Sequence, residues 1–173
     1  MTTAIADSAE APALYQTESV LSEKRRAELN ALMNQRLASA VDLQLQMKQA
    51  HWNVKGPGGV GLHELFDKVD EAVTDYVDMI AECIVQRGGI AEGTVRVAAA
   101  RTWLPEYPLT ITDGRAHAEA VARALSAFGE AARTTIEEAS ALDDDATANL
   151  FTEISRGINK WLWFVEAHAR AAK

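Results

Sequence analysis

The stretch that decides the fold is residues 61–87, GLHELFDKVDEAVTDYVDMIAECIVQR. Its apolar side chains recur every three or four residues, as they do in an α-helix that buries one face. Gly88 and Gly89 follow directly, and glycine favours a helix end because it adopts left-handed backbone without steric cost. We therefore predict a helix from about Gly61 to Arg87. The residues of its buried stripe are Leu62, Leu65, Phe66, Val69, Val73, Tyr76, Val77, Ile80 and Ile84.

Three further segments show the same periodicity, at about residues 22–54, 112–141 and 143–171. The connection between the second and third long helices is long, covering residues 90–111. A short helix is predicted at its start, and Pro105 and Pro108 then favour an extended path. Four long helices with one long crossover that carries a short helix predict an all-α, ferritin-like four-helix bundle.

Composition limits the kind of protein this is. The chain has 173 residues, a net charge of -8 and the single cysteine Cys83, so no disulfide forms within it. We expect residues 1–21 to be a flexible tail, with neither a secretory signal nor a membrane span, and residues 22–173 to form one domain. A reducing, cytoplasmic location fits this pattern. The acidic balance opposes broad binding of DNA and suits attraction of cations.

The polar face of the helix at residues 61–87 carries the chemistry. With about 100° per residue and His63 at zero, Asp67 falls near 40°, Asp78 near 60° and Glu82 near 100°. Three more polar side chains lie in or beside this arc, namely Asp70, Glu71 and Thr74. Imidazole and carboxylate together suit iron, and to a lesser degree zinc or manganese.

One helix cannot bring all four potential ligands to one ion. Asp67 and Asp78 are eleven residues apart, or about 16 Å along the axis. Two copies of the helix, antiparallel about a two-fold axis, would bring His63 and Asp67 of one chain opposite Asp78 and Glu82 of the other. His51 would complete such a site. The alternative is a solvated acidic face with no ligand function.

Two other kinds of metal site are disfavoured. The sequence lacks the Glu-x-x-His pairs that build a di-iron centre inside a bundle. The segment at residues 63–67 begins like the zinc-protease signature His-Glu-x-x-His, but its last residue is Asp67.

Several segments together resemble the Dps family, the miniferritins or DNA-binding proteins from starved cells, over about Leu29 to the C-terminus. These segments are HWNVKGP (51–57), LHELFD (62–67), DMIAE (78–82), LPEYP (104–108) and KWLWF (160–164).

The resemblance implies a hollow homododecamer that is built from two-fold dimers and contains ferroxidase centres at the dimer interfaces. It implies that His51, His63 and Asp67 come from one subunit and Asp78 and Glu82 from its partner. Such proteins oxidise Fe(II), preferably with hydrogen peroxide, and store the Fe(III) mineral, which protects against oxidative damage. Trp52 would lie beside the centre, either as an electron carrier or as a packed interface aromatic.

Other residues carry expectations of their own. Asp143, Asp144 and Asp145 resemble the acidic segment that lines the family's iron-entry pores, and helix capping is the alternative. Asn149 stands where relatives often have Asp, and Cys83 stands where they often have Arg. We expect three C-terminal aromatic residues to be core and two histidines to lie at the surface or at helix ends. The aromatic residues are Trp161, Trp163 and Phe164, and the histidines are His117 and His168.

DNA binding is the main functional alternative. Residues 1–22 contain no Lys or Arg, and the nearest basic cluster is Lys24, Arg25 and Arg26. We therefore expect weak or absent DNA binding at physiological salt. Three hypotheses remain: a peroxide-consuming ferroxidase and iron store, a nucleoid-compacting DNA-binding protein, and a catalytically silent helical cage.

Overall fold

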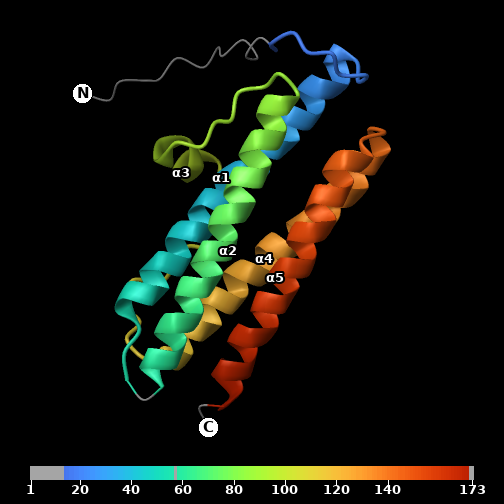
Figure 1. Ribbon diagram of the computed structural model, residues 1–173. Coiled ribbons are helices and arrows are strands. Elements are labelled where there is room, and N and C mark those ends of the chain that lie inside the picture. Colours follow the sequence, from blue (N-terminus) through green and yellow to red (C-terminus); the bar gives the residue numbers. More distant parts are fainter. Residues whose placement is uncertain (1–13, 57, 172–173) are drawn as a thin grey trace, which may run out of the picture.

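The computed structural model describes residues 14–56 and 58–171 (Figure 1), with side chains up to Ala169. In this part of the chain the elements are all helices. They are α1 (Glu23–Asn53), α2 (Gly59–Gln86), α3 (Val95–Arg101), α4 (Gly114–Ala141) and α5 (Asp145–Ala171). The predicted bundle with a crossover between α2 and α4, which carries the short helix α3, is confirmed.

Short polar side chains begin the helices. Ser22, Asp113 and Asp144 each accept a hydrogen bond from the backbone amide three residues further on, at the starts of α1, α4 and α5. These bonds satisfy amide groups that have no partner inside the helix. At the other end of α2, Gly88 has a φ of 77°, the left-handed conformation that ends the helix.

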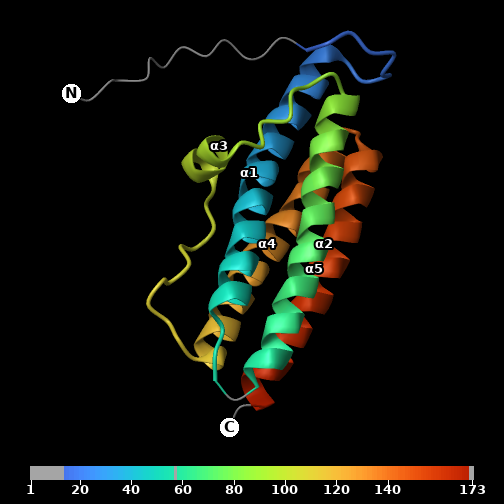
Figure 2. The same cartoon turned by 60° about the vertical axis from the view of Figure 1, so that its left-hand side comes forward.

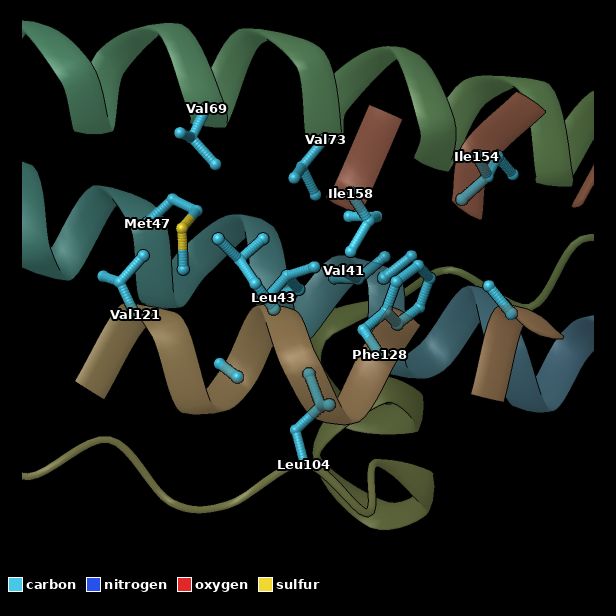
Figure 3. Close-up of a cluster of buried hydrophobic side chains, with 14 of the residues drawn as sticks. Val41, Leu43, Met47, Val69, Val73, Leu104, Val121, Phe128, Ile154 and Ile158 are labelled. Atoms are coloured by element: carbon cyan, nitrogen blue, oxygen red, sulfur yellow. The ribbon is translucent and has the colours of Figure 1, made fainter. Parts of the chain in front are cut away.

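The long helices pack as two hairpins, α1 with α2 and α4 with α5, around one apolar core. Figure 2 shows α2 and α5 side by side along the bundle. Figure 3 shows the core: Val41, Leu43 and Met47 from α1, Val69 and Val73 from α2, Val121 and Phe128 from α4, Ile154 and Ile158 from α5, and Leu104 from the crossover. Burial of each large side chain contributes about 1.5–3 kcal/mol, so the core fixes the orientation of α2.

The predicted stripe of α2 faces this core. All its members are buried except Tyr76 and Val77, which are partly buried. The expectation for the aromatic residues of α5 is only partly met. Trp161 and Phe164 pack against the core, whereas Trp163 is 63% exposed and the prediction for it is wrong. Neighbouring positions of a helix point in different directions, so one apolar segment cannot bury all its members.

The crossover is fastened to the bundle by polar contacts. Gln46 of α1 donates a hydrogen bond to the carbonyl of Pro105, at 3.1 Å. Further along, the Tyr107 hydroxyl lies 2.6 Å from Nδ1 of His117 on α4. Burial raises the pKa of Tyr107 far above its ordinary value, so the hydroxyl stays protonated. It therefore donates a hydrogen bond to the imidazole of His117.

His117 is 1% exposed and therefore does not lie at the surface, although it is near the start of α4, as the alternative prediction of a helix-end position has it. The crossover covers this face of α4, and a helical pattern alone does not show what a long connection covers. Burial lowers the pKa of His117, although the charge of Asp113 opposes the shift.

At the N-terminal end, Tyr15 donates a backbone hydrogen bond to the carbonyl of Gly88, at 2.7 Å. The predicted tail lies mainly in residues 1–13, outside the described residues. Among the helices that the structure describes, none is long and apolar enough to cross a membrane.

The buried pair predicts a pH dependence of stability. The folded pKa of His117 is lowered, so the unfolded chain binds a proton that the folded chain does not. The free energy of unfolding should therefore fall as the pH drops from about 6.5 towards the lowered pKa, and change no further from this source below it. His117→Gln, which still accepts from Tyr107, should lack this component, whereas His168→Gln at an exposed position should keep it. Thermal unfolding at fixed protein concentration measures the difference, and equal slopes for the wild type and His117→Gln would contradict the assignment.

Candidate metal centre

The turn between α1 and α2 brings two histidines together. His51 lies in the last turn of α1 and His63 near the start of α2, while Gly56 and Gly58 of the turn have φ angles of 91° and 76°. Only glycine adopts such angles readily, so these residues let the chain reverse tightly. The two imidazole rings stack, with centroids 3.7 Å apart and planes 26° apart.

Reciprocal hydrogen bonds hold the rings. Nδ1 of His51 lies 3.0 Å from the carbonyl oxygen of His63, and Nδ1 of His63 lies 2.8 Å from the carbonyl oxygen of His51. A carbonyl oxygen only accepts, so each Nδ1 carries the proton. In a neutral ring Nε2 then has the free lone pair, which is the form that binds a metal ion.

A carboxylate lies beside the rings. Oδ1 of Asp67, one turn after His63 on α2, is 3.7 Å from Nδ1 of His51 and 2.8 Å from Nζ of Lys48 on α1. The hydrogen bond from Lys48 is the main reason that the pKa of Asp67 lies below its ordinary value. The charge of Lys48 acts in the same direction, as do the two histidines when they are protonated, and partial burial opposes these effects. Asp67 is therefore ionised and ready to bind a cation, but an ammonium group already occupies it.

Lys48 contacts a second carboxylate. Its Nζ lies 3.1 Å from Oδ2 of Asp70, and hydrogen bonds to Asp67 and Asp70 raise the pKa of the lysine. Asp70 is buried, although the helical wheel places it beside the polar arc. The side chain of Lys48 reaches across from α1 and covers it. Sequence reasoning missed Lys48, because a pairing between two helices leaves no local pattern.

The remaining predicted ligands lie elsewhere on the chain. Asp78 and Glu82 are exposed on α2, about 16 Å or more along the axis from Asp67. Within the described part of the chain, no three His, Cys, Asp or Glu side chains are placed to hold one metal ion. In a single subunit, His51, His63 and Asp67 thus lie near one another without forming a three-ligand site, and the other two carboxylates lie elsewhere. Trp52 lies next to His51 and is 65% exposed.

The three aspartates between α4 and α5 differ from one another. Asp144 is buried, where it caps α5 and accepts a hydrogen bond from Arg87 at 2.6 Å. Asp143 is exposed and pairs with Arg25 at 2.8 Å, and Asp145 is exposed in the first turn of α5. Asp144 therefore acts as the N-cap of α5, and a role of these aspartates in an iron-entry pore stays a prediction.

The guanidinium of Arg87 also lies next to Cys83. Its guanidinium donates to the carbonyl oxygen of Cys83, at 3.0 Å, and to the Cys83 sulfur. It also bonds Asp144, so a side chain at the end of α2 supplies a guanidinium next to Cys83.

The histidine pair generates a prediction about protonation. The chain has four histidines, so 15N solid-state NMR of histidine-labelled protein resolves a small set of rings. At a pH where the rings are neutral, we expect His51 and His63 to carry the proton on Nδ1, because the carbonyl oxygens fix that tautomer. His51→Ala and His63→Ala assign the signals. Signals typical of Nε2–H rings for this pair would show that the reciprocal bonds do not form.

Comparison with known proteins gives a consistent result. Residues 30–173 match the family model of the ferritin-like domain. The DNA protection during starvation protein of Agrobacterium fabrum (strain C58) is 36% identical over 159 residues, which are 90% of this chain and 96% of the relative. The protein of the same name from Mycolicibacterium smegmatis is 33% identical over 153 residues, with 88% and 82% covered.

Solved structures agree with the sequence comparison. DpsA14 from Streptomyces coelicolor superposes with a TM-score of 0.85 at 32% sequence identity, and the match covers 90% of this chain and 92% of that one. The tetragonal form of Mycobacterium smegmatis Dps gives a TM-score of 0.83 at 30% identity, with 89% and 93% covered. The chain belongs to the Dps family of ferritin-like proteins.

Proposed function

We propose that this protein is a ferroxidase that oxidises Fe(II) at centres between two subunits and stores the Fe(III) product within a hollow dodecamer. The observation that carries the proposal is the stacked pair His51 and His63, whose Nδ1 atoms are both bonded to carbonyl oxygens. In the neutral rings this leaves two Nε2 lone pairs, with the ionised Asp67 close by. Imidazole with carboxylate is a donor set that suits ferrous iron.

The partner subunit would supply the missing ligands. Asp78 and Glu82 are exposed one turn apart on α2, where they are free to approach a neighbouring molecule. An antiparallel α2 pair about a two-fold axis brings them to His51, His63 and Asp67 of the other chain, and it forms this centre twice in each dimer. Assembly of such dimers into a dodecamer follows the family.

In the proposed reaction ferrous iron is the substrate. The histidines and carboxylates hold two Fe(II) ions close together, and peroxide accepts one electron from each. With two protons it becomes two water molecules, so no hydroxyl radical is released. Lys48 competes for Asp67, because its ammonium lies 2.8 Å from the carboxylate oxygen that would bind iron. An ion that uses Asp67 as a ligand therefore binds only after that contact opens.

The remaining site predictions have secondary roles. Trp52, exposed next to His51, would pack at the dimer interface or donate an electron to the centre. Asp143, exposed in the turn before α5, and Asp145, exposed at its start, would line an entry pore, and the net charge of -8 would attract cations towards it. A cytoplasmic location accompanies this function.

DNA binding is the second candidate, because the relatives' name is DNA protection during starvation protein. Removal of iron and peroxide would protect DNA without contact. The cluster Lys24, Arg25 and Arg26 is partly neutralised, since Lys24 pairs with Glu28 and Arg25 with Asp143. Few positive charges therefore remain there for phosphate groups. This favours protection of DNA by removal of iron and peroxide over protection by compaction of the DNA.

Ferrous oxidation with added peroxide tests the proposal. His51→Ala with His63→Ala should lower the rate by on the order of 100-fold in an intact assembly, because both imidazole ligands are lost. His168→Ala is the matched control, since it removes an imidazole from an exposed position near the end of α5. Size-exclusion chromatography with light scattering verifies the assembly. An unchanged rate in the double variant would leave the silent cage or DNA binding as the function.

A further inference from the structure

We propose that Asp70 is a positioning residue, which keeps hold of the Lys48 ammonium when a metal ion takes Asp67. The inference rests on the proposed function, because it concerns how one ligand of the ferroxidase centre becomes free. Asp70 would not touch the ion. It would act through Lys48 and make the exchange of partners at Asp67 less costly.

The geometry places Lys48 between two carboxylates. Its Nζ lies 2.8 Å from Oδ1 of Asp67 and 3.1 Å from Oδ2 of Asp70. The two aspartates are three residues apart on α2, so they occupy the same side of successive turns. Lys48 extends from α1 and shares its three N–H donors between them. A small movement of its flexible stem is enough to leave one carboxylate while it stays on the other.

The two carboxylates differ in burial, and this decides which of them is released. The side chain of Asp67 is 42% exposed, whereas that of Asp70 is 8% exposed. A buried carboxylate without a positive partner is unfavourable, so Lys48 should stay with Asp70. Asp67 can exchange Lys48 for a metal ion, because its exposed carboxylate is solvated by water or bound by the ion during the exchange.

Asp70 has an unused acceptor. Its Oδ1 is buried and has no hydrogen-bond partner among the described residues. When Asp67 turns to the metal ion, one N–H of Lys48 loses its acceptor. This oxygen belongs to the carboxylate that Lys48 already contacts, so it can take the released N–H. Without the charge of Asp70, the ammonium would have to remain on Asp67 or lose its anionic partner.

Two simpler roles have to be separated from this one. If Asp70 only stabilised the α1–α2 contact, its loss would lower the melting temperature and leave metal affinity unchanged. Its negative charge would also attract any cation through space. That effect does not depend on Lys48, so it would persist after Lys48 is replaced.

A double-mutant cycle distinguishes the proposed positioning role from the structural role and from attraction through space. Zn(II), which has no redox chemistry, is titrated calorimetrically into the assembled wild type, Asp70→Asn, Lys48→Gln and the double variant. We expect Asp70→Asn to weaken binding at least about tenfold in the presence of Lys48, and to change it by less than about threefold in the Lys48→Gln background. Glu137→Gln, an exposed change of equal charge on α4, should leave affinity as in the wild type.

Two outcomes would overturn the inference. Equal weakening in both backgrounds would show attraction through space, and no weakening in either would show a purely structural role. His51→Ala with His63→Ala tests the proposed function separately, since unchanged zinc binding in that variant would remove the centre itself.

A crystal structure of the zinc-loaded wild type provides a test that does not depend on whether the variants fold. Nζ of Lys48 should lie within hydrogen-bonding distance of Asp70, with Asp67 on the metal ion. A lysine that has turned into solvent would contradict the inference.

Discussion

The two hydrogen bonds between His51 and His63 are the interaction on which the proposed centre depends. Each ring donates to the backbone of the other residue, so the end of α1 and the start of α2 are held in one relative position. The same bonds select the tautomer in which the lone pair of Nε2 is free for a metal ion. The glycine turn makes the close approach possible, and the core beneath α2 prevents the helix from rotating. In the proposed centre, the two imidazole rings would thus be held in place before any ion arrives.

The centre also contains an internal competitor. Lys48 lies between Asp67 and Asp70 and weakens the repulsion between the two carboxylates. This pairing favours the empty site, because both carboxylates contact an ammonium group without a metal ion. It also sets an order of events: the histidines are available at once, whereas Asp67 becomes available after a lysine moves.

Helical periodicity was sufficient to predict the bundle, because the spacing of apolar residues such as Val69, Val73 and Ile80 is a property of the local sequence. Capping positions were equally readable from Ser22 and Asp113. The wheel also placed His63 and Asp67 on one face. Local patterns did not predict the burial of His117 by the crossover or of Asp70 beneath Lys48. Both depend on contacts between segments far apart in the chain, which no local pattern contains.

In the proposed function each centre is shared by two chains, and co-assembly of two inactive variants tests this sharing most directly. One variant carries His51→Ala and His63→Ala, and the other carries Asp78→Asn and Glu82→Gln. In a mixed dimer one centre combines both defects and the other is intact, so random pairing of equal amounts restores about one quarter of the wild-type ferroxidase rate. Mixed assemblies that stay as inactive as the separate variants would contradict a centre built across the interface.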